Sequence, residues 1–168
     1  MTYAAGTTVS VENSRAEVER LLRKRGARQT TIGADEDKGI AHVLFVLDGH
    51  TIRLELPLPQ WSAFEKKDPT PPGAWQWSDS RRAKWRTDQW EQAQKERWRA
   101  VVLLLKAKLE LIALGVSTIE REFLADLILP GQRETVGRLL ADTIAGLAST
   151  EPGGPLLLPP AQPREAGA

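Results

Sequence analysis

The sequence contains no cysteine, only two histidines, one methionine and one tyrosine among its 168 residues. Without cysteine the chain has no disulfide, no thiolate nucleophile and no cysteine-based zinc site. We interpret His42 and His50 as structural or solvated, because two histidines on one hairpin need added carboxylates to hold a metal. Phosphate-binding loops of the G-x-x-x-x-G-K and G-x-G-x-x-G types are missing, as is a nucleophile elbow. These absences argue against an enzyme, and we expect no cofactor and no metal.

Long hydrophobic runs are missing too. The longest, Ala100 to Leu105, is far shorter than the roughly 20 residues that a helix needs to cross a bilayer. The first ten residues have neither the basic nor the apolar region of a secretory signal. We therefore expect a cytoplasmic protein with no membrane partner.

A few acidic residues occur at predicted turns. They could coordinate a divalent cation through carboxylate oxygens. We favour solvated turn residues instead for this group, which comprises Asp35, Glu36, Asp37 and Asp48.

Tryptophan and positive charge are concentrated in one stretch. All six tryptophans fall between Trp61 and Trp98. Residues 61–108 contain eleven Lys or Arg and six Asp or Glu, which gives this window +5 in a chain of net charge +1. Interleaved aromatic and cationic side chains can stack on bases and neutralise phosphates. Tryptophan and arginine also dominate protein-binding hot spots. The candidate residues for binding nucleic acid or a protein partner are Trp75, Trp77, Arg81, Arg82, Lys84, Trp85 and Arg86.

The cluster Arg81-Arg82-Ala83-Lys84 begins a predicted helix. A helix N-terminus attracts anions, so three cations there weaken the helix slightly unless an anion sits nearby. The alternative is a solvated helix end, softened by neighbouring acids. Trp98 lies in an apolar stripe and is expected in the core. Trp75, Trp77 and Trp85 have polar neighbours and are expected to be exposed or to anchor a loop.

The pattern predicts an α+β fold that begins with a helix over 14–25. Ser14 and Glu17 form a capping box at its start, and Gly26 ends it. Strands are predicted at 27–33, 40–47 and 50–56.

Asp48-Gly49 is a strong hairpin signal, because a type I′ turn needs two residues that tolerate positive φ. Folding about this turn pairs Phe45 with Ile52 and Val43 with Leu54 on an apolar face directed at the long helix.

Residues 58–78 form a long Pro- and Trp-rich connection, which cannot be helical across 68–73. A long helix follows from Asp79 to Leu114. Two short helices then begin at Ser117, with a second capping box, and at Thr135. The predicted fold is thus an N-terminal helix, a three-stranded antiparallel meander, a long central helix and two short C-terminal helices. We assign residues 9–148 to a single domain and 149–168 to a disordered tail.

Two segments resemble small uncharacterised proteins encoded by tailed bacteriophages and prophages. They are ERWRAVVLLLKAKLELIALGVSTIEREFLADLILPG, residues 96–131, and the hairpin FVLDGHTIRLELPLP, residues 45–59. The resemblance covers roughly residues 9–147. It implies viral origin and action in the cytoplasm of an infected bacterial host, among genes of phage DNA metabolism. It supplies no catalytic residues.

Our leading hypothesis is a non-enzymatic phage protein that binds nucleic acid through the basic Trp/Arg segment. One alternative is a protein that binds and inhibits a bacterial defence complex, and another is a nucleotide-binding sponge. The element order also occurs in double-stranded RNA-binding domains, but here the 58–78 connection is much too long for that family. The sequence leaves open whether the protein is a homo-oligomer.

Overall fold

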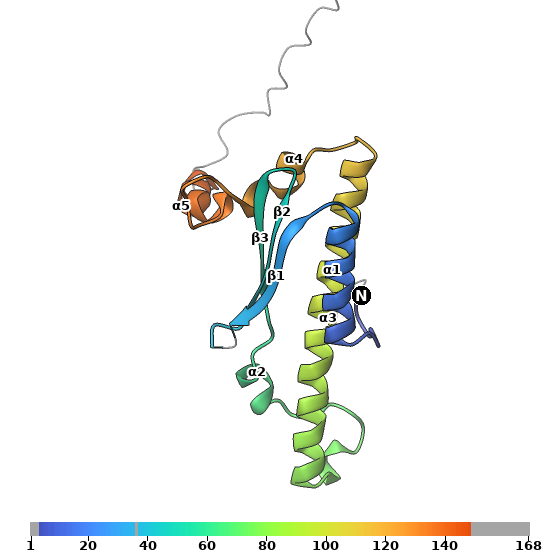
Figure 1. Cartoon of the computed structure of the whole chain (residues 1–168). Helices are drawn as coiled ribbons and strands as arrows, with labels where there is room; N and C mark the ends of the chain where they lie inside the picture. The colour runs from blue at the N-terminus through green and yellow to red at the C-terminus, as the bar shows by residue number, and fades with distance from the viewer. Residues whose placement is uncertain (1–3, 36, 149–168) are drawn as a thin grey trace, which may run out of the picture.

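A computed structural model describes residues 4–35 and 37–148 (Figure 1). The predicted tail, residues 149–168, lies outside the described residues. In chain order the elements are α1 (Val11–Lys24), β1 (Arg28–Asp35), β2 (Ile40–Leu47), β3 (His50–Pro57), α2 (Ser62–Glu65), the 3₁₀ helix η1 (Ala74–Gln76), α3 (Asp79–Ala113), α4 (Ile119–Phe123), the 3₁₀ helix η2 (Leu124–Asp126), β4 (Leu127–Ile128) and α5 (Val136–Ala148). The predicted α+β class and order of elements are confirmed.

The strands form one antiparallel sheet in the order β1-β2-β3-β4. Helices α1 and α3 lie side by side on one face of this sheet (Figure 1). The core lies between them and contains Phe45, Leu54 and Trp98, as predicted. The Phe45 ring meets the Phe123 ring edge to face, with centroids 5.9 Å apart.

The first helix starts earlier than its sequence suggested. The Ser10 hydroxyl accepts a hydrogen bond from the backbone N–H of Asn13 at 3.2 Å, and α1 begins at Val11. The predicted start at Ser14 is therefore wrong, because Ser10 provides an earlier N-cap and Ser14 is buried inside the helix. The predicted end is confirmed, since Gly26 follows the helix with φ of 82°.

The central hairpin is the one predicted. Asp48 and Gly49 have φ of 45° and 83° and make a two-residue turn. The register pairs Phe45 with Ile52 and places the apolar face inward. This alternation turns the apolar face of β2 and β3 towards α1 and α3.

The C-terminal part contains a fourth strand that the sequence did not predict. In β4, Leu127 pairs with Ile52 at the edge of β3. A strand of two residues has no recognisable alternation, so only its position beside β3 defines it. The two predicted short helices are α4 and α5, but α4 is capped by Thr118, one residue after the expected Ser117.

The long helix α3 has two halves with different surroundings. Its C-terminal half carries the buried stripe that includes Trp98, Val102 and Leu105. Its N-terminal half extends past the sheet, beside α2 and the 58–78 connection (Figure 1). Within the described residues, no helix is both long enough and apolar enough to cross a membrane.

Candidate nucleic-acid interface and an adjoining cleft

The first turn of α3 carries an ordered arginine–tryptophan pair. The Ser78 hydroxyl caps the helix and accepts from the backbone N–H of Arg81 at 3.4 Å. The Arg81 guanidinium lies 4.2 Å from the centroid of the Trp77 ring. This cation–π contact orders both side chains and leaves the guanidinium its charge and its N–H donors.

Arg82 and Arg86, one helical turn apart, fix the connection to α3. The Arg82 guanidinium donates to the carbonyl oxygens of Trp75, at 3.0 Å, and Trp77, at 3.2 Å. The Nε of Arg86 donates to the Lys67 carbonyl at 2.9 Å. Both arginines are half-buried, and both hold backbone in place.

The charges of these arginines have no acidic partners. In the described part of the chain, no carboxylate oxygen lies within 4.0 Å of the guanidinium nitrogens of Arg81, Arg82 or Arg86. Lys84 differs, because its ammonium pairs with Asp88 at 3.1 Å. It also lies about 200° around the helix from Arg82.

The structure brings most of the predicted site residues together. Trp75 is 77% exposed while its carbonyl is held by Arg82. Trp75, Trp77, Arg81 and Arg82 therefore form one cluster at the tip of α3, and Arg86 follows one turn later. Trp85 is half-buried, one turn along the helix from Arg81. Lys84 lies three residues after Arg81 on the same helix face, but its charge is paired with Asp88.

The row that begins with Arg82 and Arg86 continues along α3 with two further donors. Trp90 Nε1 and Gln94 Nε2 both donate to the Pro59 carbonyl, at 2.8 Å and 3.1 Å. Arg82, Arg86, Trp90 and Gln94 follow each other at a spacing of four residues, which places them along one ridge of the helix. Our sequence reasoning missed Trp90 and Gln94 as anchors, although this spacing was a visible signal.

A second aromatic and cationic cluster lies at α2. Trp61 is 41% exposed, and its ring meets Trp90 edge to face with centroids 6.2 Å apart. The Lys67 ammonium lies 5.5 Å from the centroid of the Phe64 ring. None of these residues was among those predicted for binding.

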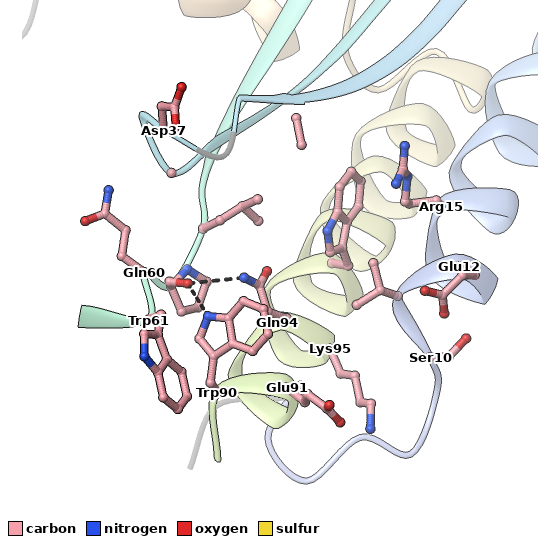
Figure 2. A pocket seen from close by; sticks show the side chains of 16 residues that line it. Ser10, Glu12, Arg15, Asp37, Gln60, Trp61, Trp90, Glu91, Gln94 and Lys95 are labelled. Carbon is pink, nitrogen blue, oxygen red and sulfur yellow. Dashed lines mark hydrogen bonds between the residues drawn. The ribbon is translucent and has the colours of Figure 1, made fainter. Parts of the chain in front are cut away.

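A cleft of about 850 Å³ opens beside Trp61, between the N-terminus of α1, the middle of α3 and residues 58–61 (Figure 2). Figure 2 shows Trp61, Trp90 and Gln94 on one side and the α1 residues on the other. Three carboxylates and two cations line the cleft, so its lining carries a net −1: Glu12, Asp37, Glu91, Arg15 and Lys95.

The charged side chains on α1 are engaged within the protein. Hydrogen bonds with its own backbone N–H and with the Ser10 hydroxyl lower the pKa of Glu12, with smaller contributions from the charges of Arg15 and Lys95. The Arg15 guanidinium lies 5.5 Å from the centroid of the Trp98 ring and donates to the Ile32 carbonyl at 3.4 Å. The cleft is thus of mixed charge, unlike the tip of α3.

The acidic turn residues do not form one cation site. Asp35 ends β1 and Asp37 lies in the turn before β2, whereas Asp48 lies in the turn after it. Eight strand residues separate these two turns by about 26 Å. Within 4–35 and 37–148, no three His, Cys, Asp or Glu side chains gather as a metal site would require.

No family model matches the sequence, and the comparisons with curated proteins and with solved structures found no similar protein.

Proposed function

We propose that the N-terminal end of α3 and the connection packed on it form a nucleic-acid-binding surface. One observation carries this proposal: the guanidinium groups of Arg81, Arg82 and Arg86 have no carboxylate partner, and the exposed Trp75 lies beside them. A phosphodiester backbone supplies the anions that these guanidinium groups lack, and a base supplies a planar surface for the ring.

The fixed conformations of the arginine side chains favour binding. Arg82 and Arg86 are held by carbonyl oxygens, and Arg81 is held by the Trp77 ring. Side chains already fixed in place lose little conformational entropy when they bind a ligand. Guanidinium also matches the geometry of a phosphate through paired N–H donors.

Trp75 supplies the contact that a purely electrostatic surface lacks. Only Arg82 among the described side chains donates to its backbone, and the ring projects beyond the fold with 77% exposure. Stacking of an aromatic ring on a base is worth about 1–3 kcal/mol.

The biological setting rests on the resemblance to phage proteins. Under our proposal the protein acts without catalysis in phage DNA metabolism, in the cytoplasm of the infected host. The same surface would serve an inhibitor of a host defence complex, and the experiment below separates the two.

The test measures the affinity of the protein for labelled single-stranded and duplex DNA and RNA as a function of salt concentration. Arg81→Ala removes a charge that holds no backbone carbonyl, so the fold should be retained. We expect it to reduce the slope of log affinity against log salt by about 0.7–0.9, the loss of one phosphate contact. Trp75→Ala should weaken binding by about 1–3 kcal/mol.

Arg97→Ala is the matched control. Arg97 is an exposed arginine of the same helix, about 24 Å along the axis from Arg81. Its loss removes the same charge and should leave the salt slope unchanged. Absence of salt-dependent affinity in the wild-type protein at low ionic strength would refute nucleic-acid binding and leave a host protein as the partner of this surface. An equal effect of Arg97→Ala would show a general charge effect only.

A further inference from the structure

We infer that the nucleic acid bound at this surface is single-stranded and runs along the connection from Trp75 to a second stacking ring, Trp61. This inference rests on the proposed function and adds the class of ligand and the length of the site. It is motivated by Trp61, Lys66 and Lys67, which flank α2 and were not among the predicted binding residues.

Trp61 is built as a fixed platform. Its ring is 41% exposed and rests edge to face against Trp90, at an interplanar angle of 88°. Trp90 is itself fixed by the hydrogen bond from its Nε1 to the Pro59 carbonyl. A partly exposed ring held from behind can stack on a base without first being ordered.

The region between the two rings carries a net charge of +1, because Glu65 and Asp68 flank Lys66 and Lys67 and Arg86 adds one positive charge. Arg86 reaches the carbonyl of Lys67, which brings the guanidinium and the exposed Lys67 side chain into one region. Lys66 adds a second exposed cation next to it. Phosphates of a strand that spans the two rings would meet these charges.

The spacing of the anchors sets the length of the strand. Arg82 holds the Trp75 backbone, and Trp90 holds the Trp61 ring, and these two positions are eight residues apart on α3. Eight helical residues span about 12 Å. That corresponds to at most three to four nucleotides, because about 3.4 Å is the rise per nucleotide of a fully stacked strand and an unstacked strand spans more per nucleotide.

The stacking contacts favour a single-stranded ligand. In a duplex both faces of each base are covered by its neighbours, whereas an unpaired base can leave the stack and offer a face. Two exposed rings, of which Trp61 is held by Trp90, therefore favour unpaired bases. Trp61 also lines the adjoining cleft, and the path ends there, because the charged side chains that line the cleft carry a net −1 and would repel a polyanion.

The test uses labelled oligothymidylates of about two, four, six and eight nucleotides, with duplexes of the same lengths. For the wild-type protein, affinity should rise steeply up to about four nucleotides and only slowly beyond, and single strands should bind more tightly than duplexes. Trp61→Ala should weaken binding of the six-nucleotide strand by about five- to one-hundred-fold. The same variant should leave the two-nucleotide strand unchanged.

A conservative variant guards against a folding defect. Trp61→Phe keeps an aromatic ring and should retain most of the affinity, while circular dichroism checks the fold of both variants. Leu114→Ala is the control for loss of exposed apolar surface, because Leu114 is an exposed apolar residue at the other end of α3.

The outcomes separate this inference from the proposed function. If Trp61→Ala leaves all affinities unchanged, or weakens duplex and single strand equally, the single-stranded path is refuted. The proposed function still stands in that case, provided that Arg81→Ala and Trp75→Ala weaken binding. If no nucleic acid binds the wild-type protein, both fail together.

Discussion

The Pro59 carbonyl joins the connection to α3, and removal of its donors tests how the connection is held. Two side chains share this oxygen, Trp90 Nε1 at 2.8 Å and Gln94 Nε2 at 3.1 Å. A carbonyl has two lone pairs, so each donor can bind independently. Gln94→Met removes one donor and preserves the length of the side chain. Trp90→Phe removes the other and keeps a ring.

Each single change leaves the carbonyl with one donor. A neutral hydrogen bond contributes about 0.5–1.5 kcal/mol net, so Gln94→Met should lower the free energy of unfolding by about 1 kcal/mol. Trp90→Phe should cost somewhat more, because the smaller ring also loses packing against Trp61. The double variant leaves a half-buried carbonyl without a protein donor. Its free energy of unfolding should therefore fall by about 1 kcal/mol more than the sum of the decreases in the two single variants.

Urea unfolding followed by circular dichroism measures these differences as shifts of the midpoint at constant slope. Trypsin gives a local readout, because Lys66 and Lys67 lie in the connection and should be cleaved faster when the anchor is lost. Gln89→Met is the matched control, since Gln89 is a half-buried glutamine of α3 with no hydrogen-bond partner among the described side chains. If the loss of unfolding free energy in the double variant equals the sum of the two single losses within about 0.5 kcal/mol, a shared carbonyl as the anchor is refuted.

Three further outcomes follow from the packing. Trp98→Ala should lower the free energy of unfolding by about 3–5 kcal/mol, because this core side chain is only 2% exposed; a loss below about 1 kcal/mol in urea unfolding would contradict that. Gly137→Ala should destabilise the protein by about 1–3 kcal/mol despite its better helix propensity, because a Cβ there would lie 2.9 Å from the Ala125 carbonyl oxygen; a raised melting temperature would show that α5 can shift. A hydrogen bond with Lys106 lowers the pKa of Glu17 in the folded protein, so the stabilisation is complete above the pKa of the unfolded chain and is lost as pH falls through the folded value. Glu17→Gln should therefore lower stability at neutral pH and flatten its decline in acid, and an unchanged acid titration of stability would count against this ion pair.

Much of the candidate site was predictable, and the part that was missed has a clear physical reason. Exposure of Trp75 and burial of Trp98 follow from their neighbours in sequence, since one lies in a polar stretch and the other in an apolar helical stripe. The structural role of Arg82 was not predicted, because its partners are backbone carbonyls, which every residue carries and which no sequence pattern marks. Trp61 was missed because its platform depends on Trp90, 29 positions later in the chain.

Features that depend on contacts within a few residues could be predicted from the sequence alone. These are the Asp48-Gly49 turn with its register and the glycine that ends α1. Positive φ and helical periodicity are local properties of the chain, so the residues there suffice to specify them. The N-caps were less certain, since Ser10 and Thr118 cap α1 and α4 in place of the predicted Ser14 and Ser117. The remaining features arise only from tertiary packing. It paired β4 with β3, placed two donors of α3 on Pro59 and opened the cleft beside Trp61. Those contacts join segments tens of residues apart, and their geometry exists only once the sheet and the two long helices have packed together.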